Sequence, residues 1–172
     1  MARVDFSNAN LDKAIFTCAT IHESDFSGVK FDKLNAQGVD FQASIFNKTE
    51  FQNANLSNAN FEEADLSGAM ITDSRLDGIN LVKSIMKNMQ INNVNLQKAN
   101  LVSANLSNSK ITNTAFFGVD IRGANLSQVV MRDCSFESSD LTGLKATGAS
   151  FTNIDFIQGI VDEVTFTGTN FE

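Results

Sequence analysis

The chain has 172 residues, a formal net charge of −7, a sequence pI of about 4.6 and 42% hydrophobic residues. This composition excludes a disordered chain, and the acidic balance argues against direct nucleic acid binding, which needs a basic surface. No apolar run reaches the ~18 residues of a membrane span, and the first residues, MARVDFSNAN, lack the apolar region of a signal peptide. The sequence therefore favours a soluble, cytoplasmic protein.

An apolar residue returns at every fifth position from Phe6 to Phe171, without a slip in register. Residues 53–70, NANLSNANFEEADLSGAM, give the pattern at Leu56, Phe61 and Leu66. The 34 central positions hold 14 of the 15 Phe, and the position two places earlier is small or β-branched in most units. The position two places later is Gly in nine units and Asn in eight. The unbroken register predicts a single domain over 1–172.

A period of five matches neither the 3.6-residue period of a helix nor the 2-residue period of a strand. Two inward residues that flank one outward residue form a very short strand. Gly or Asn two places after the centre tolerates the positive φ that a type II turn requires. If each turn bends the chain by a right angle, four units close a square coil. The 34 units then give about 8.5 coils, stacked ~4.8 Å apart into a rod of about 40 Å.

Two units have alanine at the centre instead of a large apolar residue, and both support a packed interior. Where the centre is Ala36, the earlier inward position is Leu34, and where it is Ala146, that position is Leu144. Exchanging the large and small positions conserves core volume. Residues between the inward positions, such as Ser57 and Asn108, are predicted to point outward.

The units AnLsn at 54–58, AdLsg at 64–68 and AnLsq at 124–128 resemble the A(D/N)LXX units of the pentapeptide repeat family. The resemblance covers about 6–172 and implies an all-β fold, a right-handed quadrilateral parallel β-helix. The square coil considered above agrees with that fold, but its four-sided closure and its handedness are what the resemblance implies, because the periodicity alone does not give them.

No constellation for catalysis, cofactor binding or metal binding is present in the sequence, so an enzyme is not expected. His22, the only histidine, lies at an outward position. As a catalytic base it would need an orienting partner, so a solvated surface histidine is expected. Cys134 lies at an inward position and Cys18 points outward, about six coils apart, so both thiols are expected to be free. A filled narrow rod has no obvious pocket, so function is expected on its outer faces.

Charge is concentrated on one predicted side, centred on residues 21, 41, 61 and every twentieth residue up to 161. Its acids are Glu23, Asp40, Glu62, Glu63, Asp120, Asp140, Asp162 and Glu163. Only Lys83 and Arg122 oppose these eight acids, so this side carries −6 of the net −7. The charge is either a solubility device or an interaction strip for a basic protein partner. Four outward apolar residues are further candidate contacts: Val82, Val102, Phe117 and Ile157.

The resemblance implies two functions, a non-enzymatic scaffold for protein–protein interaction or a DNA mimic. Members of the quinolone-resistance type are thought to imitate duplex DNA and to occupy the DNA-binding saddle of gyrase or topoisomerase IV. This chain differs from many of them, because no loop interrupts its coil and no dimerisation helix is recognisable at its C-terminus. Repeats reach both ends, so a homodimer or end-to-end packing through a terminus is expected.

Overall fold

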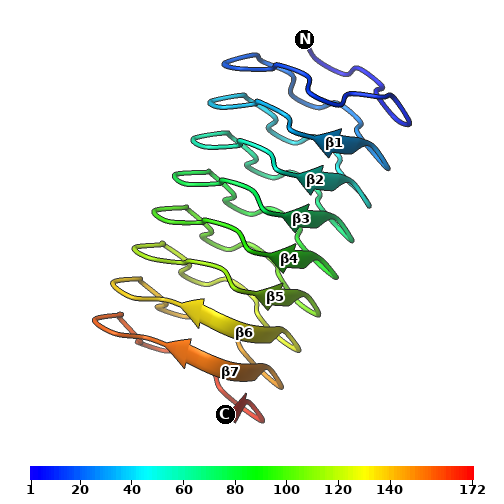
Figure 1. Ribbon diagram of the computed structural model, residues 1–172. Coiled ribbons are helices and arrows are strands. Elements are labelled where there is room, and N and C mark those ends of the chain that lie inside the picture. Colours follow the sequence, from blue (N-terminus) through cyan, green and yellow to red (C-terminus); the bar gives the residue numbers. More distant parts are fainter.

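The structure, a computed structural model that describes residues 1–172, is an all-β solenoid whose coils stack from one terminus to the other (Figure 1). One parallel sheet runs along the rod in the order β1 to β8. Its strands are β1 (Lys30–Asp32), β2 (Glu50–Gln52), β3 (Met70–Thr72), β4 (Gln90–Asn92), β5 (Lys110–Thr112), β6 (Val130–Ser135), β7 (Ser150–Asp155) and β8 (Asn170–Phe171). The structure has no helix with the length and apolarity that a membrane span requires.

The predicted coil of four five-residue units is confirmed by the strand pairing. Phe31 of β1 pairs with Phe51 of β2, and the same sequence offset holds through to β8, which lies seven turns after β1. Isolated parallel bridges repeat this offset away from the sheet, as in Asp40 with Asn60. Backbone groups join the coils, and the Phe61 N–H donates to the carbonyl of Asn80 at 2.7 Å.

The rod therefore has four faces, and each face takes every fourth five-residue unit along the chain. We call them the acidic face (centres 21, 41 and so on), the Ile45 face (centres 6, 26, 46 and so on), the strand face (centres 11, 31, 51 and so on) and the Phe117 face (centres 16, 36 and so on). Followed along one coil, the acidic face lies opposite the strand face. The Ile45 face lies opposite the Phe117 face.

The predicted turn positions have positive φ without exception. Every fifth residue from Arg3 to Gly168 has a positive φ, which makes 34 positions. Of these, 25 are non-glycine residues and nine are glycines. On three faces the N–H three places after a centre commonly donates back to the carbonyl of that centre, which completes a type II turn. The Ala59 N–H, for example, donates to the Leu56 carbonyl at 3.1 Å. Phe31 and Phe51 on the strand face accept no such bond, and their segments pair as strands instead.

Ala43 lies in this left-handed region, with φ of 54° and an exposed side chain. An L-residue with a Cβ is strained there, whereas glycine is not. We expect Ala43→Gly to raise the free energy of unfolding by about 0.5–1 kcal/mol in denaturant melts. The matched control, Ala115→Gly at a position without positive φ, should lower it by a similar amount. A loss of stability in Ala43→Gly would contradict this account of the turns.

The inward positions form one continuous core of 45 buried residues. Leu34, Ala36, Leu144 and Ala146 are all buried, as the exchange of large and small positions predicts. Phenylalanine rings stack from coil to coil, and Phe26 and Phe46 lie 4.9 Å apart with their planes 2° from parallel.

Inward serines join neighbouring coils through their hydroxyl groups. Ser109 Oγ accepts from the Met89 N–H at 3.0 Å and donates to the Met86 carbonyl at 2.8 Å. Ser139 Oγ donates in the same way to the Phe116 carbonyl at 2.7 Å. Every buried side-chain nitrogen and oxygen has a partner, so these polar groups are satisfied within the core.

Four positions depart from the inward and outward assignments. Val161 and Phe171 are central residues, yet they are 48% and 53% exposed. They lie at the end of the rod, where no following coil covers their side chains. Ser107, which lies at an outward position, is only 8% exposed, and Ser57 was predicted to point outward but is only 3% exposed. Its Oγ lies 2.8 Å from both Asn55 Oδ1 and Asp77 Oδ1, so hydrogen bonds hold it against the corner of the coil. Asn108 is exposed, as expected.

Candidate functional site: the outer faces

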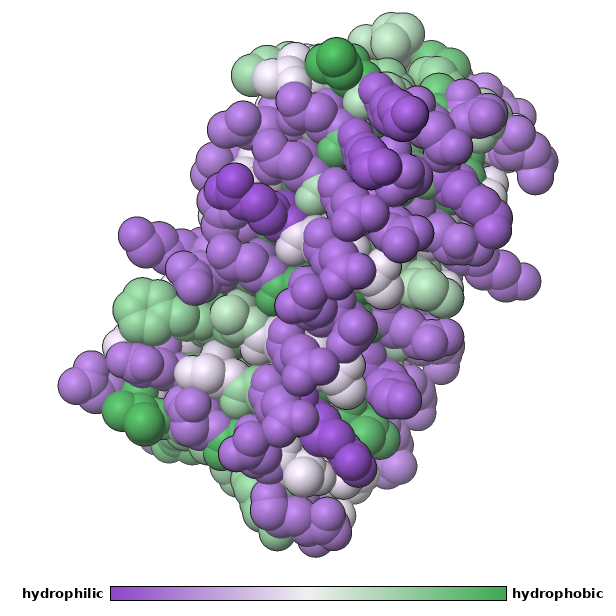
Figure 2. Space-filling view, viewed as in Figure 1, coloured by the Kyte–Doolittle hydropathy of each residue, from purple (hydrophilic) through white to green (hydrophobic).

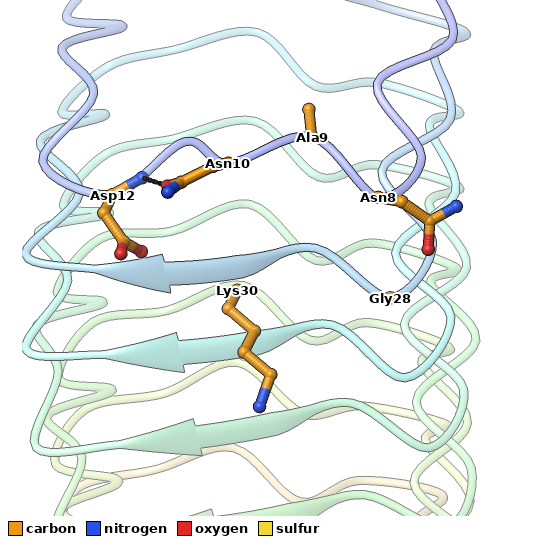
Figure 3. A pocket seen from close by; sticks show the side chains of 6 residues that line it. All are labelled: Asn8, Ala9, Asn10, Asp12, Gly28 and Lys30. Atoms are coloured by element: carbon orange, nitrogen blue, oxygen red, sulfur yellow. Dashed lines mark hydrogen bonds between the residues drawn. The ribbon is translucent and has the colours of Figure 1, made fainter.

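The hollows of the surface are shallow and their side chains diverge. Figure 3 shows one of about 300 Å³ near the N-terminal end, lined by Asn8, Ala9, Asn10, Asp12, Gly28 and Lys30. Lys30 points away from Asn8 and Gly28, and its Nζ pairs with Glu50 at 3.0 Å. No group of three or more His, Cys, Asp or Glu side chains could hold a metal ion. Nothing here converges on a reacting atom, so the faces remain the candidate site.

The two thiols lie in different environments and form no disulfide. Cys18 is exposed, whereas Cys134 is buried beside the carbonyl of Arg132, 3.3 Å from its Sγ. Burial raises the pKa of the Cys134 thiol to about 11, which suppresses the reactive thiolate at neutral pH.

We expect one equivalent of a maleimide to label the native protein at pH 7.5, at Cys18. Cys134 should react only after denaturation, because its thiol is both protonated and covered. Mass spectrometry of labelled peptides measures this directly. Equal labelling of both thiols in the native protein would mean that this core position opens readily.

All eight predicted acids lie along the acidic face, and none of them is buried. Asp40, Asp120 and Asp140 occupy the position before a centre, in a column that continues through asparagines at 60, 80 and 100. The Asn60 amide donates to Asp40 Oδ1 at 2.9 Å, and the Asn80 amide donates to Asn60 Oδ1 at 2.9 Å. Polar side chains thus bridge the coils along this face.

The three aspartates of this column also have a structural role that the charge count did not predict. Asp40 Oδ1 accepts from the Gln42 N–H at 3.1 Å, and Asp140 Oδ1 accepts from the Thr142 N–H at 3.0 Å. Asn60 and Asn80 make the same bond two residues onward. The D/N position of the repeat was the available signal, because Asp and Asn side chains stabilise turns in this way.

Ion pairs neutralise part of the acidic face. Glu63 pairs with Lys83 at 3.1 Å, while Arg122 contacts Asp120 at 2.7 Å and Asp140 at 3.7 Å. The side-chain hydrogen bond from Arg122 is the main cause that lowers the pKa of Asp120.

Arg3 extends this pairing to the N-terminal end of the face, where it contacts Glu23 at 2.8 Å. Its hydrogen bond is the main cause of the lowered pKa of Glu23. With Arg3 included, eight acids face three bases, so the face carries −5. Four acids form no ion pair: Asp40, Glu62, Asp162 and Glu163.

The candidate apolar contacts are only partly brought together. Val82 and Val102 are half-buried neighbours in successive coils, and the Lys83 N–H donates to the Val102 carbonyl at 2.9 Å. Phe117 and Ile157 are exposed in one column of the Phe117 face, but Glu137 lies between them. Figure 2 shows a largely hydrophilic surface on which apolar residues form small separate groups.

Comparisons with known proteins agree with this architecture. Residues 44–116 match the family described as Pentapeptide repeat region, and residues 1–32, 114–156 and 134–172 match Pentapeptide repeats (8 copies). The chain belongs to the pentapeptide repeat family. No curated protein matches it.

Two solved structures share the fold. One is HetL, a pentapeptide repeat protein involved in heterocyst differentiation regulation from the cyanobacterium Nostoc sp. strain PCC 7120, with 19% identity, a TM-score of 0.64, and coverage of 98% of this chain and 90% of that chain. The other is a trypsin-treated form of QnrB1, a plasmid-mediated fluoroquinolone resistance protein, with 20% identity, a TM-score of 0.65, and coverage of 100% and 90%. At these identities the likeness establishes the fold alone.

Proposed function

We propose that the protein is a non-enzymatic scaffold whose acidic face binds a basic protein partner. The observation that carries this proposal is the gathering of eight acids on one of four faces, with a net charge of −5 there. Hydrogen bonds in every coil and a filled core fix the backbone positions that carry these carboxylates. A rigid backbone loses little conformational entropy on binding, and rows of charge upon it favour a complementary basic surface.

The unpaired acids are the groups that a partner would engage. Asp40 and Glu62 lie near the N-terminal part of the face, and Asp162 and Glu163 lie near its C-terminal end. Between them, Val82 and Val102 form a small apolar contact beside the ion pair of Lys83. The proposed partner therefore carries basic side chains at two levels of the rod, separated by about 24 Å for a stack of five coils at ~4.8 Å.

A second candidate function is DNA mimicry directed at a type II topoisomerase, and the carboxylate column is the observation that favours it. Duplex DNA carries one charge per ~1.7 Å of its axis. The acidic face carries −5 along about 40 Å, or about one charge per 8 Å. Because this density is only about a fifth of that of DNA, we favour the scaffold. A gyrase supercoiling assay with and without quinolone separates the two, since the scaffold predicts no effect at micromolar protein.

The scaffold proposal is tested by neutralising acids that do not stabilise turns. The variant combines Glu62→Gln, Glu63→Gln, Asp162→Asn and Glu163→Gln, which leaves the three aspartates of the column in place. Its control combines Asp12→Asn, Asp32→Asn, Asp73→Asn and Asp133→Asn on the opposite, strand face. Partners captured from cell extract by the wild-type chain are identified, and their affinities are compared.

We expect the acidic-face variant to lose at least tenfold in affinity and the control to keep wild-type affinity. Binding should also weaken with salt, as the Debye length falls from about 10 Å at 0.1 M to 3 Å at 1 M. Equal loss from the two variants, or binding indifferent to salt, would contradict a charged docking face and leave the acids as a solubility device.

A further inference from the structure

We propose that the Ile45 face binds the same face of a second copy of this chain, with the two rods antiparallel. This inference does not depend on the proposed function, because it uses a different face. Two observations carry it: the way charge is distributed along this face, and its pair of exposed isoleucines.

The charges of the Ile45 face sum to zero but are unevenly distributed along the rod. Asp5, Asp25 and Asp65 lie in the N-terminal half of one column, and Lys145 lies near the C-terminal end of the same column. Beside this column lie Lys48 and Lys87. None of these six charged side chains forms an ion pair within the chain, in contrast to all three bases of the acidic face.

Two exposed isoleucines lie near the middle of the face. Ile45 and Ile85 are each 40% exposed and flank Asp65 in the column, two coils or about 10 Å apart. The positions beside the column hold small side chains, among them Ser27, Ser67, Ser107 and Ser127. Asn47 and Lys87 are the only larger side chains at these positions, directly after each centre.

Charge complementarity selects the orientation. In a parallel pair related by an axis along the rod, each coil lies at the same level as the identical coil of the second copy. Asp5 then lies at the level of the second Asp5, and Asp25 at the level of the second Asp25, so like charges share a level. Consider instead a two-fold axis that lies in the interface and crosses the rods at a right angle, between the levels of Asp65 and Lys87. Asp65 then reaches the level of Lys87 of the second copy, and Asp5 reaches the level of Lys145 of the second copy. Each contact occurs twice by symmetry, and no like charges meet.

The small area of one face makes this a weak association. Three extended residues at ~3.3 Å span about 10 Å across a face, so a rod of about 40 Å offers roughly 400 Å² per copy. A total of about 800 Å² lies below that of stable complexes and in the range of transient ones. We therefore expect a dimer that forms only in concentrated, low-salt solution.

Sedimentation equilibrium from 10 μM to 1 mM protein tests the proposal, at 50 mM and at 500 mM salt. The wild-type chain should approach the dimer mass at high concentration in 50 mM salt, and high salt should weaken the dimer at least tenfold. Lys87→Glu places two carboxylates opposite each other and should also weaken it at least tenfold. Lys98→Glu, an exposed and unpaired lysine on the Phe117 face, is the control and should leave the dimer unchanged.

A charge exchange makes the test independent of overall charge. Asp65→Lys combined with Lys87→Glu restores opposite charges across the axis and should recover most of the lost association. Lysine is accommodated at the column position, because Lys145 occupies it, and circular dichroism checks the fold of each variant. A monomer at all concentrations, a dimer indifferent to Lys87→Glu, or a double variant as weak as Lys87→Glu alone would each overturn the proposal. An end-to-end dimer would give the second of these outcomes.

Discussion

Phe46→Ala should lower the free energy of unfolding by about 3–5 kcal/mol, the usual loss for a truncated buried aromatic side chain. The ring is fully buried, and its centroid lies 4.9, 5.1, 5.7 and 5.0 Å from those of Phe26, Phe41, Phe51 and Phe61. These rings belong to the same coil and to the coils on either side. The cavity cannot collapse easily, because hydrogen bonds fix the spacing of the coils. Urea denaturation followed by circular dichroism measures the loss.

Gln97→Ala is the control for this core truncation. Gln97 is exposed, makes no side-chain hydrogen bond and does not lie at a positive-φ position, so its removal should cost under about 0.5 kcal/mol. Ser57→Ala is unsuitable as a surface control, because the Ser57 hydroxyl is buried and hydrogen-bonded. Similar losses in Phe46→Ala and Gln97→Ala would show that the five-residue pattern does not define the core.

Leu34→Ala should lower the free energy of unfolding by about 2–5 kcal/mol. Leu34 and Ala36 are the two inward residues of one unit, and both are fully buried. The substitution leaves two alanines there, with no large side chain to fill that corner of the coil. Ala36→Leu alone should also be destabilising, by about 1–3 kcal/mol, because it overpacks the same space.

The two substitutions together place the large residue at the centre, as in most other units. We expect the double variant to be at least about 1 kcal/mol more stable than the sum of the single losses predicts, since residues that share a space are coupled. The double-mutant cycle is measured with the same urea melts. Strict additivity would mean that Leu34 and Ala36 fill separate spaces. The explanation that exchanging large and small residues conserves core volume would then fail for Leu144 and Ala146 as well.

The five-residue unit could be predicted from the sequence, because it depends on spacing and turn chemistry. The four-sided closure of the coil came instead from the resemblance to the pentapeptide repeat family. Inward positions such as Phe61 and Ala59 follow from strand alternation, and the positive φ at Gly68 follows from the residue type. Once four units make one coil, each face is set by counting, which placed all eight acids correctly on one face. The exposure of Val161 could not be read from a local pattern, because it depends on the absence of a covering coil.

The electrostatics of the candidate site could be predicted only in part. The number of charges on a face follows from the sequence, but the pairing of Arg122 with both Asp120 and Asp140 depends on side-chain conformation. The burial of Ser57 likewise needs Asp77 in the next coil to lie within hydrogen-bond reach. The restriction of continuous strands to one face has no counterpart in the five-residue pattern, which is the same on all four sides.

Paired positions in neighbouring coils are always one four-unit coil apart in the sequence. As a result, different features of the sequence determine the core and the surface. Side-chain direction depends on position within a unit, whereas the choice of face depends on the place of that unit within the coil. Inserting one extra unit at a corner near residue 90 would keep every downstream inward residue inward. It would also turn the downstream surface by a quarter of a coil, and carry Asp120, Asp140 and Asp162 away from the face of Glu62. In such a chain, the number of units between two charged residues determines the angle between them around the rod axis. Adding or removing one unit changes this angle by a right angle and leaves the interior unchanged.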